Sequence, residues 1–116
     1  MNKHQAVTSL AALAHEQRLS IFRLLVKCGP NGMPAGKIAS AVKSSPTASS
    51  FHLKELDRAG LIRSTRDGRY VRYAARYEGM RQLLEFLTED CCQGSPELCG
   101  TAFASKKKVL AKGGPR

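Results

Sequence analysis

The first half of the chain carries apolar residues at the three- and four-residue spacing that is typical of amphipathic helices. The first such segment places Val7, Leu10, Ala11 and Ala14 on one face. This spacing predicts four helices, at about residues 5–14, 16–28, 34–42 and 46–59.

Residues that favour helix ends lie at these boundaries. Gly29 and Pro30 stop the second helix. Ser45 is a good N-cap and Pro46 a good first residue for the fourth helix, and Gly60 is its expected C-cap. The third and fourth helices are therefore expected to form a helix-turn-helix pair.

The next segment changes to the composition of strands. Two β-prone runs, residues 61–66 and 69–74, flank Asp67 and Gly68, a strong signal for a hairpin. A last helix is expected at about 77–90, since apolar residues again recur every 3.6 positions at Met80, Leu83, Leu84 and Leu87. The predicted class is mainly α (α+β): a winged helix-turn-helix with about five helices and a two-stranded β-hairpin wing.

Length and charge refine this prediction. The 116 residues fit one small domain, here 1–104 followed by a disordered basic tail, 105–116, and dimerisation would supplement its limited core. With no signal peptide and no apolar run near the ~18 residues of a membrane span, we expect a cytoplasmic protein.

The charge is strongly positive, since Lys and Arg number 19 against 9 Asp and Glu. Residues 43–76 hold eight Lys or Arg and three Asp or Glu, which indicates a polyanion partner, although a basic soluble surface is the alternative.

The fourth helix has two faces on a helical wheel. Ser49, Leu53 and Leu56 lie on the inward side. The outward side is short and polar at its N-terminal end and basic further along, as Thr47, Ser50, Phe51, Lys54 and Arg58 show. Such a face fits the DNA major groove, where hydroxyls reach base edges and an aromatic ring meets a thymine methyl. His52, at the edge of the inward side, is expected to be a packed histidine.

Arginines surround the predicted hairpin. Arg66 and Arg69 flank the turn and should project furthest, with Arg63 and Arg72 behind them. Wing arginines contact phosphates or enter the minor groove, although charge also keeps an edge hairpin soluble. The predicted DNA-contacting residues, Ser49 included for its hydroxyl, are Thr47, Ser49, Ser50, Phe51, Lys54, Arg58, Arg66 and Arg69.

Three segments resemble ArsR/SmtB-type metalloregulatory repressors. They are residues 12–25 (ALAHEQRLSIFRLL), 50–62 (SFHLKELDRAGLI) and 66–73 (RDGRYVRY), within a resemblance over about 8–99. The resemblance implies a homodimer built on the first and last helices, which binds double-stranded operator DNA at an imperfect inverted repeat. It also implies that a bound metal or metalloid lowers the affinity for this operator.

The cysteines depart from one common pattern of that family. Many arsenic-responsive members carry a cysteine pair at the start of the third helix, but residues 35–41 contain none. The chain instead resembles the subgroup with a vicinal pair just after the last helix and a third cysteine further on, here Cys91, Cys92 and Cys99. Cys28, at the end of an apolar helix, is expected to be a small packed residue.

Three thiols in one short segment suit a soft ligand. Trivalent arsenic, As(III), favours three sulfurs in a pyramid, whereas structural zinc takes four ligands. Sb(III) and a trivalent methylated arsenical are further candidate inducers. Glu89 and Asp90 could supply hard ligands, so cadmium, lead and zinc stay open, as does a redox switch that pairs Cys99 with Cys91 or Cys92.

The sequence argues against an enzyme. A thiol-dependent phosphatase or arsenate reductase needs an arginine a short, fixed distance after its cysteine, and no cysteine here has one. No Cys-x-x-Cys occurs. We therefore predict a transcriptional repressor that is released from its operator by As(III).

Overall fold

The computed structural model describes residues 1–89. The chain forms two compact units, Met1–Phe86 and Leu87–Arg116, and the second is described only for its first residues, 87–89. Cys91, Cys92 and Cys99, and the predicted boundary between 104 and 105, lie outside the described residues.

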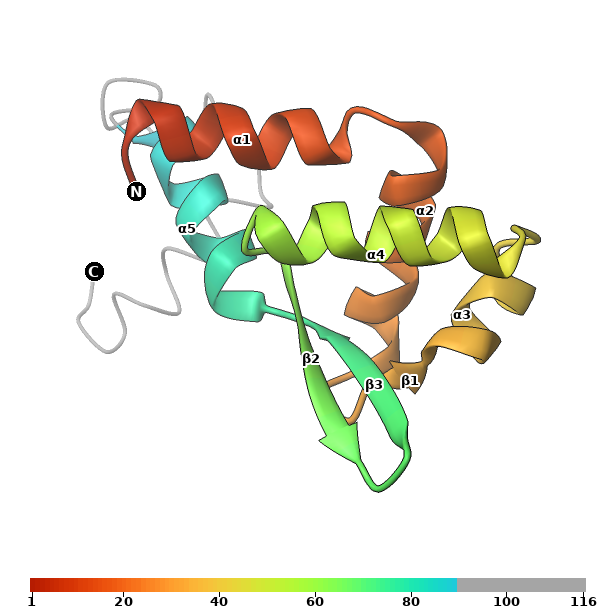
Figure 1. Cartoon of the computed structure of the whole chain (residues 1–116). Coiled ribbons are helices and arrows are strands. Elements are labelled where there is room, and N and C mark those ends of the chain that lie inside the picture. Colours follow the sequence, from red (N-terminus) through yellow and green to blue (C-terminus); the bar gives the residue numbers. More distant parts are fainter. Residues whose placement is uncertain (90–116) are drawn as a thin grey trace. The chain divides into compact units, whose positions relative to one another are not determined.

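The described residues fold as a winged helix-turn-helix, as predicted (Figure 1). Five helices accompany a three-stranded antiparallel sheet. In chain order the elements are α1 (Lys3–Leu13), α2 (Glu16–Cys28), β1 (Met33–Pro34), α3 (Ala35–Ala41), α4 (Pro46–Arg58), β2 (Ile62–Asp67), β3 (Tyr70–Ala75) and α5 (Tyr77–Thr88).

Local interactions set the start of α4 and the turn that joins it to α3. The Ser45 hydroxyl accepts a hydrogen bond from the Ala48 N–H at 3.1 Å, and Pro46 follows in the first turn, which confirms the predicted cap. Lys43, in the turn before it, adopts a left-handed φ of 55°. This conformation is unusual for a residue other than glycine, and it makes the chain reverse sharply between the two helices.

The sheet confirms the predicted hairpin, which is β2–β3, and adds a third short strand to it. The strand order is β1-β3-β2, because Met33 and Pro34 pair with Tyr73 and Arg72. The two-residue hairpin turn is also one position later than predicted: Asp67 pairs with Tyr70, so Gly68 and Arg69 form the tip. Gly68 has a φ of 67°, the positive value that the first turn position of a type II′ hairpin requires.

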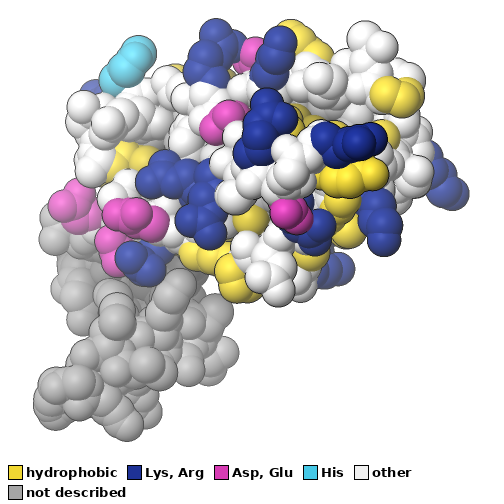
Figure 2. Space-filling view, turned by 60° about the horizontal axis from the view of Figure 1, so that its bottom comes forward, with side chains coloured by type: hydrophobic (Ala, Val, Ile, Leu, Met, Phe, Trp, Pro, Cys, Tyr) yellow, Lys and Arg dark blue, Asp and Glu magenta, His cyan; other side chains and the backbone are white. Residues whose placement is uncertain are grey.

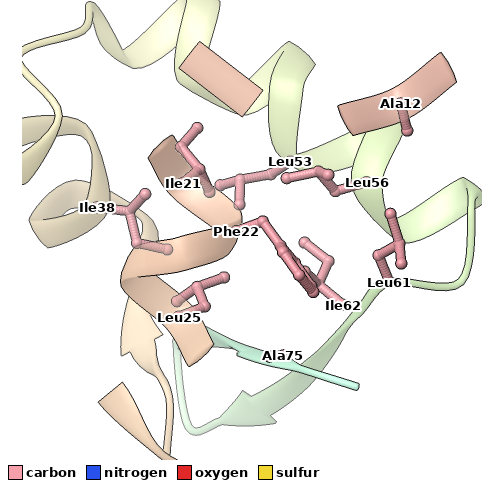
Figure 3. Close-up of a cluster of buried hydrophobic side chains, with 10 residues drawn as sticks. All are labelled: Ala12, Ile21, Phe22, Leu25, Ile38, Leu53, Leu56, Leu61, Ile62 and Ala75. Carbon is pink, nitrogen blue, oxygen red and sulfur yellow. The ribbon is translucent and has the colours of Figure 1, made fainter. Parts of the chain in front are cut away.

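The core lies between α2, α4 and the base of the wing (Figure 3). Ile21 and Leu25 of α2 pack with Leu53 and Leu56 of α4, and all four side chains are almost completely buried. Truncation of a side chain in such a position costs about 2–5 kcal/mol. This core therefore fixes α4 against α2 and leaves the other side of α4 for function.

The side of α1 that faces the core carries small side chains. Ala6, Ser9 and Ala12 are buried, and the Ser9 hydroxyl donates to the Ala59 carbonyl at the end of α4 at 3.5 Å. The stripe predicted as apolar is on the opposite side, where Val7 is 57% and Leu10 is 42% exposed. We call this stripe the α1 apolar face; it consists of Val7, Leu10, Ala11 and Ala14.

Candidate nucleic-acid interface

The outward side of α4 presents the predicted set of side chains to solvent. Phe51, a large apolar ring, is 55% exposed. The wing extends away from the same helix (Figure 1). Together these exposed residues form what we call the α4–wing surface: Thr47, Ser50, Phe51, Lys54, Arg58, Arg66 and Arg69.

Ser49 does not belong to this surface. Its side chain is 1% exposed, and its hydroxyl has no hydrogen-bond partner among the described residues. A buried hydroxyl cannot reach a base or a phosphate while α4 keeps its packing. The structure thus corrects the inclusion of Ser49 among the DNA-contacting residues and keeps its neighbour Ser50, which is exposed.

Arg58, at the end of α4, has an ion-pair partner within the helix. Its Nη2 lies 2.6 Å from the carboxylate oxygens of Glu55, one turn earlier. The arginine side chain is nevertheless 73% exposed, so it can turn to another anion. A phosphate at this position would compete with Glu55, which weakens the contact relative to that of an unpaired arginine.

The wing arginines divide into two groups. Arg69 lies in the hairpin turn itself, and Arg66 is exposed on β2. Arg72, in contrast, is held by the loop after α2: its guanidinium donates to the carbonyls of Asn31 and Gly32 at 3.0 and 3.1 Å. Arg72 therefore fixes the base of the wing, whereas Arg66 and Arg69 carry free positive charge at its end.

One exposed residue of the wing tip was not predicted. Tyr70 follows Arg69 directly and is 63% exposed. Its phenol can donate to a phosphate, as tyrosines often do in protein–DNA interfaces. Tyr70 begins β3, within the strand that the sequence predicted, but no residue pattern indicated that its ring would be exposed.

Positive charge dominates one face of the molecule. Figure 2 shows Lys and Arg side chains spread over this face with apolar side chains between them, and a group of Asp and Glu side chains at one edge. Such a mixture of basic and apolar groups fits a surface that binds phosphates and base edges together.

His52 is buried on the inner side of α4, as the prediction of a packed histidine required. Its ring contacts that of His15, with the ring centroids 4.6 Å apart. Burial lowers the pKa of His52, and the electrostatic influence of His15 and Arg18 lowers it further. The ring is therefore neutral near pH 7 and does not add to the charge of the surface.

Cys28 differs from its prediction as a packed residue. It is exposed at the end of α2, and its thiol donates to the Gly32 carbonyl at 3.3 Å. Within residues 1–89, no cluster of three His, Cys, Asp or Glu side chains could hold a metal ion. Any thiol-rich site thus belongs to the part of the chain beyond α5.

Comparison with known proteins agrees with this geometry. A family model described as "Helix-turn-helix domain" matches residues 13–65. The transcriptional activator HlyU of Vibrio cholerae is 31% identical over 94 residues, which cover 81% of this chain and 84% of HlyU. The chain belongs to the ArsR/HlyU-type helix-turn-helix transcriptional regulators. This family of DNA-binding regulators is not enzymatic.

Solved structures of similar regulators share the fold. A homodimeric winged helix-turn-helix domain from Mycobacterium bovis, described as a possible ArsR-family regulator, is 26% identical. It has a TM-score of 0.62 and the match covers 75% of this chain and 81% of that one. A possible transcriptional regulator for arsenical resistance is 29% identical, with a TM-score of 0.60 and coverage of 68% and 79%.

The regulator's described helices are too short or too polar to cross a membrane.

Proposed function

We propose that this regulator is a repressor that binds an inverted-repeat operator as a homodimer and is released when As(III) binds Cys91, Cys92 and Cys99. The observation that carries the DNA-binding part is the exposure of a polar, aromatic and basic side of α4 next to a wing with free arginines. Thr47 and Ser50 at the N-terminal end of α4 would reach base edges, and Lys54 would reach phosphates.

The α1 apolar face supports the dimer. Val7 and Leu10 are exposed large apolar side chains on one stripe of one helix, and such a contiguous patch is typical of protein interfaces. The similar M. bovis domain is described as homodimeric. A two-fold axis would place two copies of α4 about one DNA turn apart, which is the geometry that an inverted repeat requires.

The thiols support arsenic as the ligand. Cys91, Cys92 and Cys99 lie within one short segment after α5. Thiolates are the ligands that soft ions prefer, and three of them match the pyramidal coordination of As(III). One of the similar structures is a possible regulator for arsenical resistance. When bound, the ion would join the three thiolates.

Contacts between the start of α5 and the segment directly after α4 offer a route from the thiols to the DNA surface. The Arg76 guanidinium donates to the Gly60 carbonyl at 3.1 Å, and the Arg76 N–H donates to the Leu61 carbonyl at 2.8 Å. A Cβ on Gly79 would clash with the Gly60 carbonyl oxygen, so α5 packs directly on the segment that follows α4. A shift of α5 would therefore move the end of α4. A typical coupling of ~1–3 kcal/mol would weaken operator binding about 5- to 150-fold.

The test measures release of DNA by arsenite. A fluorescent duplex is first selected from a randomised pool by the wild-type protein, and its affinity is followed by fluorescence anisotropy as arsenite is added. We expect arsenite to lower the affinity of wild type and to leave that of Cys92→Ser unchanged. Cys28→Ser, which removes a thiol outside the proposed site, is the matched control and should respond as wild type does.

Three outcomes would change the proposal. Equal release of wild type and Cys92→Ser would exclude the assigned site. Release by cadmium, lead or zinc but not by arsenite would replace the ligand. Release by mild peroxide, with a disulfide from Cys99 to Cys91 or Cys92 in the mass spectrum, would replace the ligand by a redox signal.

The same assay separates the arsenic species. An arsenical with one methyl group has two positions left for sulfur, so Cys91 and Cys92 would suffice for it. We expect Cys99→Ser to lose its response to arsenite and antimonite and to keep its response to the methylated arsenical. A loss of all three responses would mean that Cys99 also holds the methylated ligand.

A further inference from the structure

Two histidines meet where the beginning of α2 packs against α4. The rings of His15 and His52 lie with their centroids 4.6 Å apart and their planes tilted by 51°. His15 is the N-cap of α2, and its Nδ1 accepts a hydrogen bond from the Gln17 N–H at 3.2 Å. Only a histidine with an unprotonated Nδ1 can accept this bond.

The surroundings of His52 oppose a positive charge. The residue is 8% exposed, and its Nδ1 is buried without a hydrogen-bond partner among the described residues. Burial is the largest cause of its lowered pKa, followed by the charges of His15 and Arg18. Arg18 is fixed nearby, because its Nε donates to the Ala12 carbonyl at 2.8 Å. A protonated His52 would have an unpaired buried N–H and two positive neighbours.

No carboxylate is among the causes that set the pKa of His52. Glu55, one turn after His52 on α4, is already paired with Arg58 at 2.6 Å. The groups that act on the pKa of His52 are His15 and Arg18, both of them cationic when charged. The elements that pack against α4 are α1, α2, α3 and β2. Their other titratable groups, none of which is among these causes, are Lys3, His4, Glu16, Arg23, Lys27, Cys28, Lys37, Arg63, Arg66 and Asp67.

The pair is connected to the DNA surface through Phe51. The Phe51 ring meets the His52 ring edge-on, with the centroids 5.8 Å apart, and Phe51 is exposed on the outward side of α4. A displacement of His52 would therefore also displace a side chain of the α4–wing surface.

We propose that His15 and His52 are positioning residues: as a neutral pair they hold α4 in its DNA-reading orientation, and protonation in acid releases it. This inference rests on the proposed DNA binding. Two protonated rings at this distance repel each other. Protonated His15 also can no longer cap α2, and its charge faces the positive end of that helix.

The direction of the pH effect follows from proton linkage. If the DNA-bound form requires the neutral pair, it binds fewer protons than the free protein in acid. The affinity for DNA then falls in acid, below the ordinary range of histidine, because the pKa of His52 is lowered. Ordinary histidines near phosphates have the opposite effect, because their protonation strengthens DNA binding.

The experiment compares pH profiles of DNA affinity between about pH 8 and about pH 5.5 at constant ionic strength, with the selected duplex. Wild type should lose about tenfold in affinity, which corresponds to about one pKa unit of difference between free and bound protein. In His15→Asn/His52→Gln, which keeps a capping side chain and has no titrating ring, the profile should be flat. His4→Gln, which removes an exposed histidine of α1, is the matched control and should follow wild type.

Each outcome decides. A double variant with the wild-type profile, or a wild-type affinity that is constant or rises in acid, would overturn the proposal. A parallel loss of helical circular dichroism in wild type would also overturn it, because acid would then act on folding as a whole. If the double variant fails to fold, His15→Asn alone should lose less affinity in acid than wild type, because one of the two titrating rings is gone, and an unchanged loss would exclude the pair.

Failure of the underlying function looks different. A wild-type protein that selects no duplex and binds no DNA even at about pH 8 would refute the proposed DNA binding itself. DNA binding that is strong but independent of pH would refute only the role of the histidine pair.

Discussion

The α1 apolar face and the α4–wing surface are both exposed, yet they differ in the chemistry they present. Val7 and Leu10 on α1 are large and apolar, and the face that they form with Ala11 and Ala14 contains no charge. The α4–wing surface instead combines hydroxyls, one aromatic ring and four basic side chains.

This difference indicates two different partners. An uncharged apolar stripe gains free energy by removal from water, which a second protein surface provides. Lys and Arg gain free energy by release of counterions from a polyanion. Substitutions in each surface test whether the two act separately, and their expected effects decrease from Leu10 to Ser49.

The largest effect is expected at Leu10. Leu10→Glu places a charge in the α1 apolar face, which would prevent its burial against a second copy. Loss of the second half-site contact should lower affinity for the selected duplex by about 100- to 10,000-fold. Sedimentation equilibrium and fluorescence anisotropy measure both effects.

Leu19→Glu is the control for this change. Leu19 is 44% exposed on α2, close to the 42% of Leu10, but it belongs to neither surface. Leu19→Glu should leave both the dimer mass and the DNA affinity unchanged. If Leu10→Glu stays dimeric, the interface lies elsewhere on the chain.

A smaller effect is expected at the exposed ring of α4. Phe51→Ala removes an apolar contact to a base edge, and we expect a loss of ~1–3 kcal/mol in binding to the selected duplex. Binding to a scrambled duplex should change much less, and the dimer should persist. Competition titrations give the ratio of the affinities for the selected and the scrambled duplex. An equal loss on both would mean that Phe51 contacts DNA without reading its sequence.

The wing tip should contribute charge rather than specificity. Arg69→Ala is expected to weaken binding to every duplex and to reduce the slope of log affinity against log salt by about one. Anisotropy over a salt series measures this slope. Arg23→Ala, an exposed arginine of α2 outside the surface, should leave it unchanged. A loss confined to the selected duplex would mean that Arg69 reads bases.

The smallest effect is expected at Ser49. Ser49→Ala replaces a buried hydroxyl that has no partner among the described residues, so unfolding free energy should be unchanged or slightly higher, and DNA affinity should not change. Ser50→Ala, at the neighbouring exposed position, should lower affinity several-fold without affecting stability. Urea denaturation measures the stability of both variants, and anisotropy measures their DNA affinity. If Ser49→Ala lowers DNA affinity, Ser49 does contact DNA.

Much of the fold follows from local signals in the sequence. α2 begins and ends where apolar spacing and Gly29-Pro30 predict it, and Ser45 caps α4 as expected. These signals suffice because helix ends are decided by side chains a few residues away. The same local chemistry made the outward side of α4 predictable.

The parts that sequence reasoning missed depend on distant partners. β1 contains only Met33 and Pro34, and it is a strand because Tyr73 and Arg72, far along the chain, pair with it. Arg72 looked like a wing charge, but its partners are carbonyls of the loop before β1. Neither interaction leaves a periodic pattern that a single sequence could reveal.

The close approach of Gly79 to the Gly60 carbonyl has a consequence for engineering biosensors. Arg76, directly before α5, and Gly79, in its first turn, connect α5 to the segment that follows the DNA-reading helix. Both precede Cys91, Cys92 and Cys99 in the chain. Sensing segments could therefore be exchanged behind residue 86 while this joint is kept. A different inducer should therefore be sought by altering the segment after α5 while Gly79 is kept. Even the methyl group of an alanine at position 79 would push α5 away from the Gly60 carbonyl.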